Sequence, residues 1–207
     1  MNEIKLALTG AMRSGKSSVA TILCADYGFH EIAFGDALKR LAHEVFPDVP
    51  REPKPRALYQ QFGQAMRNMP VPGAADVWVE HAMNRVEFWL DQAAMSARRG
   101  DGAFLPRVVI SDLRQPNEFD RCRAEGFTII RVMAPANLRL ARARRAGDDF
   151  TEADLAHETE QYVDEFAVDY EIVNDSDIDD LVAKVSAIMA ELGVTPIELP
   201  AIGNEPF

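Results

Sequence analysis

The sequence predicts an α/β fold built on a parallel sheet. Short apolar runs that suit buried strands alternate with longer segments of helical spacing, and a glycine-rich turn joins the first run to the first helical segment. The chain has 207 residues, of which 47% are hydrophobic. This length and composition fit one domain with a small subdomain and a full core.

The charge and cysteine content exclude several classes of protein. Acidic residues number 33 and basic residues 22, for a net charge of −11, which argues against a protein that coats nucleic acid or an anionic membrane. Cys24 and Cys122 are too few for a disulfide framework or a Cys-ligated zinc site. With no basic leader and no apolar run near the ~20 residues that span a bilayer, we expect a cytoplasmic protein without nucleic-acid or membrane partners.

The first half of the chain predicts two strands and four helices. Each apolar run of strand length precedes a segment with helical spacing, and glycine or proline ends each helical segment. Four prolines between residues 47 and 55 make that stretch a loop. The expected strands are 4–9 and 29–34, and the expected helices are 16–27, 36–46, 58–69 and 74–99.

The second half predicts three more strands. The run Arg107–Ser111 is the clearest of them, and the last helix has an apolar face that ends before Gly193. The expected strands are 107–111, 127–133 and 170–173. The expected helices are 137–146, an acidic region over 152–166, and 177–192, and the tail 194–207 is expected to be irregular.

A phosphate-binding motif follows the first predicted strand. The run GAMRSGKS matches G-x-x-x-x-G-K-[ST] from Gly10 to Ser17 and opens a predicted helix, as the motif requires. Glycines let backbone N–H groups turn toward phosphates, Lys16 reaches the outer phosphates, and Ser17 offers an oxygen to Mg²⁺. The residues expected to bind the nucleotide here are Gly10, Ala11, Arg13, Ser14, Gly15, Lys16, Ser17 and Ser18.

Asp112 stands just beyond an apolar strand, where a doubly wound sheet places its ligand crevice. It is a candidate second ligand for Mg²⁺ beside Ser17, and Arg114 is a candidate phosphate-binding residue. An N-cap or turn aspartate is the alternative interpretation of Asp112.

Arginines cluster near residue 140 of this acidic chain. Arg139, Arg142, Arg144 and Arg145 precede Gly147 and an acidic stretch, which suggests a lid over about 135–160 that excludes water and gathers charge around a transferred phosphoryl group. Arg142 is a candidate catalytic residue and Arg139 a candidate nucleotide-binding residue. The alternative is a solvated helix face.

A second pocket is expected between the second and third strands, over about 36–100. Asp36 and Lys39 lie one helical turn apart, and Arg67 can meet a phosphate. Asp76 and Trp78 open the long helix and offer a polar group and a stacking surface, although Trp78 is equally consistent with core packing.

These blocks together resemble the deoxynucleoside monophosphate kinases of tailed phages, within the nucleoside monophosphate kinase superfamily. The resemblance covers most of residues 4–192. Its matching stretches are LALTGAMRSGKSSVA, FGDALKRLAHEVF, FGQAMRN, ADVWVEHAMNRV, VVISDLRQPNEFD and YEIVND. The order of these blocks carries the resemblance, because the phosphate-binding loop alone occurs in many other proteins.

The resemblance implies a three-layer P-loop kinase fold over 1–193, with a five-stranded parallel sheet, a lid and an acceptor-binding helical subdomain. It implies ATP with Mg²⁺ as donor and a deoxynucleoside 5′-monophosphate as acceptor, in the host cytoplasm if the gene is a phage's. Related kinases are often homodimers, so a homodimer is one assembly that the resemblance allows. Asp36, Lys39 and Arg67 would then serve the acceptor, Asp112 and Arg114 would lie between acceptor and metal, and Asn174 would approach the adenine. The resemblance assigns no role to the proline-rich segment 47–55.

Three other functions remain open from the sequence. The pattern is also similar to phosphomevalonate kinases of the animal type and, more distantly, to dephospho-coenzyme A kinases. A protein of a different class, a nucleotide-dependent switch or assembly ATPase, would carry the same loop but need no second substrate site.

Overall fold

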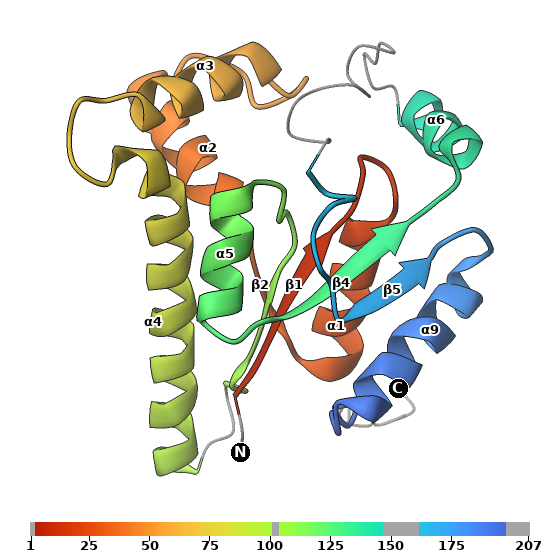
Figure 1. The fold of residues 1–207 in the computed structure, drawn as a ribbon. Helices are drawn as coiled ribbons and strands as arrows, with labels where there is room; N and C mark the ends of the chain where they lie inside the picture. Colours follow the sequence, from red (N-terminus) through yellow and green to blue (C-terminus); the bar gives the residue numbers. More distant parts are fainter. Residues whose placement is uncertain (1–2, 101–103, 147–161, 198–207) are drawn as a thin grey trace, which may run out of the picture.

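The computed structural model describes residues 3–100, 104–146 and 162–197, and its centre is a five-stranded parallel sheet (Figure 1). The strands lie in the order β2 (His30–Ile32), β3 (Arg107–Ile110), β1 (Ile4–Thr9), β4 (Thr128–Met133) and β5 (Tyr170–Val173). Leu6 of the central strand β1 pairs with Val109 of β3 and with Thr128 of β4. The predicted α/β class with five parallel strands is confirmed.

Helices cover both faces of the sheet. Helices α1 (Lys16–Tyr27) and α9 (Ile178–Glu191) lie on one face, while α4 (Val77–Arg99) and α5 (Pro116–Ala124) lie on the other (Figure 1). Leu6 and Leu8 point into the core beneath α1 and α9, and Ala7 points into the core on the opposite face. This alternation is the two-residue period of a strand buried on both sides, which explains why the strands read as continuous apolar runs.

Three further helices stand at the carboxyl end of the sheet. Helices α2 (Phe34–Val45) and α3 (Arg56–Arg67) form a group on one side, and α6 (Ala136–Arg145) lies on the other (Figure 1). A 3₁₀ turn, η1 (Ala74–Asp76), leads into α4. In the described ranges, no helix is long and apolar enough to cross a membrane.

Most predicted elements are present within two residues of their expected ends, but α4 begins three residues later than expected because the 3₁₀ turn η1 precedes it. Phe34 begins α2 instead of ending a strand, because the Asp112 carboxylate accepts a hydrogen bond from its N–H. Helix α5 was not predicted from the sequence. The acidic helix expected over 152–166 lies mainly outside the described residues, and its described end, 162–166, forms turns and bends. Residues 194–197 of the tail are irregular, as expected.

Candidate functional site

The loop between β1 and α1 has the backbone that its glycines predict. Gly10 and Gly15 have φ angles of 130° and 112°, and the α1 helix begins directly after Gly15. A Cβ on Gly15 would lie 2.0 Å from Asn174 Nδ2, and one on Gly10 would lie 2.1 Å from the Val132 carbonyl oxygen. Only glycine fits at either position, so the loop forms a narrow cradle at a helix N-terminus.

This cradle fits the phosphates of ATP. The Lys16 ammonium donates hydrogen bonds to the carbonyl oxygens of Gly10 and Ala11, across the loop. The hydroxyl of Ser14 is fully buried and has no hydrogen-bond partner among the described residues. Ser17 and Asp112 line one adjoining cavity of about 470 Å³ and would hold Mg²⁺, which commonly takes only one or two protein oxygens and keeps several waters.

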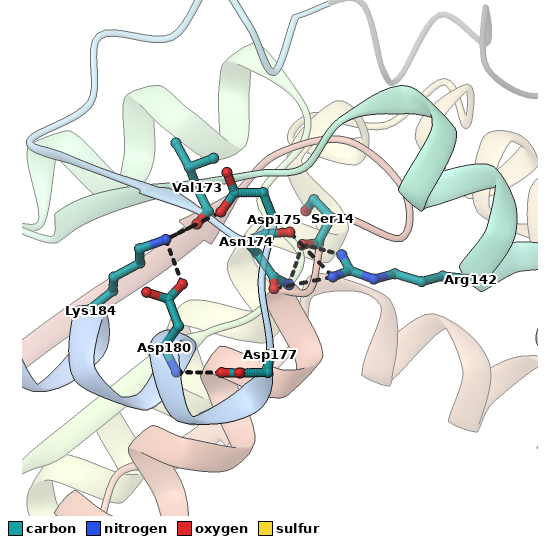
Figure 2. A network of polar contacts seen from close by, with 8 residues as sticks. All are labelled: Ser14, Arg142, Val173, Asn174, Asp175, Asp177, Asp180 and Lys184. Carbon is teal, nitrogen blue, oxygen red and sulfur yellow. Dashed lines mark hydrogen bonds and ion pairs between the residues drawn. The ribbon is translucent and has the colours of Figure 1, made fainter.

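A polar network holds the back of the loop (Figure 2). Asn174, at the end of β5, donates a hydrogen bond from Nδ2 to the Ser14 carbonyl oxygen at 2.8 Å. Arg142 of α6 donates to the Ser14 carbonyl at 3.3 Å and to Asn174 Oδ1 at 3.2 Å. Lys184 of α9 donates to the Val173 carbonyl at 2.6 Å and pairs with Asp180 at 2.7 Å.

In this network, the two predicted residues Asn174 and Arg142 are hydrogen-bonded to the backbone of the phosphate-binding loop. The Asn174 amide, which the resemblance directs toward adenine, is engaged with the loop backbone. Arg142 is likewise bonded to the loop, while both residues also line the main cavity. Arg139 Nη1 donates to the Met12 carbonyl at 3.5 Å, so α6 touches the loop at two points. Of the proposed lid, 135–146 is described, and residues 147–160 lie outside the described ranges.

One cavity of about 860 Å³ joins the loop to α2 and α3. The structure brings together predicted donor and acceptor residues in its wall, although they come from six separate parts of the chain. The predicted residues that line it are Arg13, Gly15, Lys16, Ser17, Ser18, Lys39, Arg67, Arg114, Arg142 and Asn174. The adjoining smaller cavity shares Lys16, Ser17, Lys39 and Arg114 with it and adds Asp36 and Asp112.

Asp112 caps a helix across the chain. Its carboxylate accepts hydrogen bonds from the N–H groups of Phe34 at 2.7 Å and Gly35 at 3.1 Å, at the start of α2. Burial raises the pKa of this carboxyl group, and these two hydrogen bonds oppose the rise, as do the nearby charges of Arg114 and Lys39. The N-cap of α5, the helix that follows Asp112, is Gln115, so Asp112 does not cap its own helix as the alternative interpretation expected. The metal role of Asp112 stays a prediction.

Glu118 is a functional candidate that the sequence analysis missed. Its Oε2 accepts hydrogen bonds from the N–H groups of Arg114 at 2.8 Å and Gln115 at 2.9 Å, so this buried carboxylate fixes the turn that carries Arg114. Burial and the charge of Asp112 raise the pKa of Glu118 to about 7. Pro116 and Glu118, at the first and third positions of α5, are the helix-start signals that could have found it.

Two predicted acceptor residues lie outside the cavity walls. Trp78 is only 2% exposed and donates a hydrogen bond from Nε1 to the Gly63 carbonyl at 3.2 Å. The predicted stacking surface at Trp78 is therefore wrong, and its core interpretation is correct. Asp76 accepts a hydrogen bond from Asn117 Nδ2 at 2.7 Å and lines neither cavity.

Four of the cavity residues that were not predicted come from one stretch of the chain. They are Lys54, Arg56, Tyr59 and Gln60, from the proline-rich segment and the first turns of α3. Tyr59 Oη lies 2.8 Å from His43 Nε2, which fixes the phenol against α2. The spacing of Arg56, Tyr59 and Gln60 puts all three on the helix face that also carries Arg67, a signal that was available in the sequence.

Comparison with known proteins supports this architecture. No family model matches the chain, and no curated protein matches it. Shikimate kinase from Acinetobacter baumannii in complex with shikimate is similar with a TM-score of 0.52 and 12% identity, over 94% of this chain and 97% of that one. An unliganded sugar kinase from Janibacter is similar with a TM-score of 0.51 and 14% identity, over 93% and 96%. The chain has the fold of P-loop kinases such as shikimate kinase.

Proposed function

We propose that the chain is an ATP-dependent kinase that transfers a phosphoryl group to a phosphate, and that its acceptor is a deoxynucleoside 5′-monophosphate. The observation that carries this proposal is the single cavity that connects the phosphate-binding loop to a second group of cations. A switch ATPase needs the loop but has no use for that second group.

The second group of cations suits an acceptor that is itself a phosphate. Lys39, Arg67 and Arg114 also line the cavity, and the guanidinium of Arg67 is half-buried with no ion pair among the described residues. A phosphate that is ionised at neutral pH needs positioning and charge neutralisation more than it needs a general base. This arrangement favours a phosphate acceptor over a hydroxyl acceptor.

The nucleoside part of the proposal rests on the start of α3 and on the sequence resemblance. Tyr59 offers an aromatic ring, and the exposed Gln60 offers an amide donor and acceptor, in the same wall of the cavity as Arg67. A flat, polar heterocycle is the chemical group that such a pair recognises. Residues 36–100 would then form the acceptor-binding part of one kinase domain, and 135–160 its lid.

The reaction would be a direct, in-line transfer in which the protein acts by positioning. Lys16 would hold the outer phosphates of ATP, with Mg²⁺ between Ser17 and Asp112, while Arg67 and Arg114 hold the acceptor phosphate. Mg²⁺ supplies neutralisation of charge on the transferred group. No covalent enzyme intermediate is needed.

The test is ADP production from Mg-ATP with one acceptor at a time. The acceptors are dGMP, dTMP, dCMP, dAMP, their ribose counterparts, phosphomevalonate and dephospho-coenzyme A. Turnover with one or more deoxynucleotides supports the proposal. Turnover with a non-nucleotide acceptor alone would assign a different substrate and contradict the nucleotide assignment. ATP hydrolysis without any acceptor would favour a switch or assembly ATPase.

A further inference from the structure

Lys54 occupies a position that the proposed function leaves unexplained. It stands between Pro53 and Pro55, directly before α3 begins at Arg56. Proline fixes its own φ angle and restricts the residue before it to extended conformations. The backbone that carries Lys54 is therefore confined before any ligand binds, which lowers the entropy cost of using its side chain.

The Lys54 side chain reaches the cavity and forms no ion pair with the described residues there. The chain contains five lysines, and three of them, Lys16, Lys39 and Lys54, line this one cavity in a protein of net charge −11. Within the described part of the chain, the Lys54 ammonium makes neither an ion pair nor a hydrogen bond. Three of the four charged groups that act on Lys54 are cations, namely Lys39, Arg114 and Arg56, and the fourth is the carboxylate of Asp112.

The surroundings of Lys54 disfavour the charged form of its side chain, and its pKa is therefore lowered. Its side chain is accessible to solvent in the cavity, yet protein atoms crowd it, and burial lowers its pKa. The charges of Lys39, Arg114 and Arg56 lower the pKa further, and Asp112 acts in the opposite direction. The proximity of Lys39, Arg114 and Asp112 places Lys54 near the junction of the two cavities, because Lys39 and Arg114 line both.

We propose that Lys54 is a further substrate-binding residue, which holds the phosphate of the acceptor together with Arg114 at the junction of the two cavities. An anionic phosphate in this position would relieve the repulsion among the cations that meet there. Of the segment 47–55, only Lys54 lines the cavity, and this residue would thus be part of the acceptor site. This inference rests on the proposed function and adds to it a residue that neither the motif nor the resemblance assigns.

Kinetics of matched variants test the proposal. For Lys54→Met we expect kcat/KM for the acceptor to fall at least 10-fold, while KM for ATP changes less than 2-fold. Lys54→Arg should recover kcat/KM to within 3-fold of the original chain, because it restores the charge. Arg51→Met is the control, since Arg51 is exposed in the same segment and lines neither cavity. A Lys54→Met value within 3-fold of the control overturns the proposal.

Chemical labelling of the unaltered protein gives a second test that needs no turnover. Acetic anhydride labels accessible amines, and peptide mass spectrometry reports Lys54 and, as reference, Lys184, which lies outside both cavities. We expect dTMP or dGMP at saturation to lower Lys54 labelling at least 3-fold relative to Lys184. Equal labelling with and without each nucleotide and with inorganic phosphate overturns the role of Lys54.

The two tests separate this inference from the proposed function. If a deoxynucleotide is phosphorylated but Lys54→Met behaves like Arg51→Met, only the role of Lys54 fails. If no acceptor is phosphorylated, the proposed function fails, and labelling in the presence of inorganic phosphate still decides whether Lys54 binds an anion.

Discussion

At the scale of single residues, Lys16 is the cation on which phosphoryl transfer would depend most directly. Its ammonium already lies against the loop that would hold the phosphates. We expect Lys16→Met to lower kcat by on the order of 10²-fold or more, because one preorganised cation is lost from the transition state. The measurement is coupled ADP production, with circular dichroism to check the fold. Lys5→Met, remote from both cavities, should keep its turnover.

Glu118 makes stability depend on pH. Its pKa is raised from 4.5 to about 7 in the folded chain, so between these values the folded state binds more protons than the unfolded state. The free energy of unfolding therefore falls as pH rises from about 4.5 to 7, by up to about 1.4 kcal/mol per pH unit for one proton.

Glu118→Gln should remove that part of the slope, because the amide oxygen still accepts hydrogen bonds but does not titrate. Urea unfolding at pH 5, 6 and 7 measures how the free energy of unfolding changes with pH. Glu125→Gln, on an exposed carboxylate at the end of the same helix, should keep the original slope. An unchanged slope in Glu118→Gln would contradict the assigned origin of the pH dependence.

Residues of the donor site were predictable, and several of the acceptor site were not. Gly10 to Ser17 form a contiguous motif, and the spacing of its residues is enough to predict the conformation of the loop. Lys54 belongs to a segment without periodicity, so its approach to Arg114 arises only from tertiary packing. Trp78 was ambiguous because an aromatic residue near a pocket suits stacking and core packing equally, and burial decides between them.

At the scale of elements, Gly63 of α3 lies against the side chain of Leu38 of α2. A Cβ there would lie 2.5 Å from Leu38 Cδ1, and Leu38 lines the cavity. We expect Gly63→Ala to displace Leu38 or α3, with a loss of about 1–3 kcal/mol in the free energy of unfolding. KM for the acceptor should rise several-fold while KM for ATP stays unchanged. Steady-state kinetics and thermal unfolding check both effects.

Gln64→Ala is the matched control for this prediction. Gln64 is the next residue of α3, and its exposed side chain bonds only to Asn68 within the described ranges. It should leave both KM values as they are. Equal acceptor KM values in the two variants would contradict the role assigned to the contact between α2 and α3.

The buried strands and the long amphipathic helices were predictable from the spacing of their apolar residues. A helix shows an apolar residue every three or four positions on its buried face, and a strand that is buried on both sides is a continuous apolar run. Helix α5 was missed because its sequence, PNEFDRCRA, is strongly polar and buries little besides Glu118 and Cys122. What holds it in place is the hydrogen bonding of Glu118 at its start, which hydrophobic spacing does not reveal.

At the scale of the whole molecule, the residues proposed for the donor and for the acceptor line one cavity. A single molecule that joins adenosine to deoxythymidine through a chain of phosphates should therefore occupy both sites. We expect its Kd to lie at least 10-fold below that of ADP, because the second contact becomes intramolecular. Isothermal titration calorimetry measures both values. A Kd equal to that of ADP would contradict simultaneous occupation.

The order of the strands also governs how the chain acquires its nucleotide site during synthesis. The loop lies after β1, the first strand made, but β1 pairs with β3 and β4, and Asn174 reaches Ser14 across 160 residues. Contacts so distant in sequence form slowly and late. A nascent chain that ends before β5 therefore carries the complete loop motif without its brace. We therefore expect nucleotide binding to need the finished molecule, even though its motif is encoded within the first 17 residues.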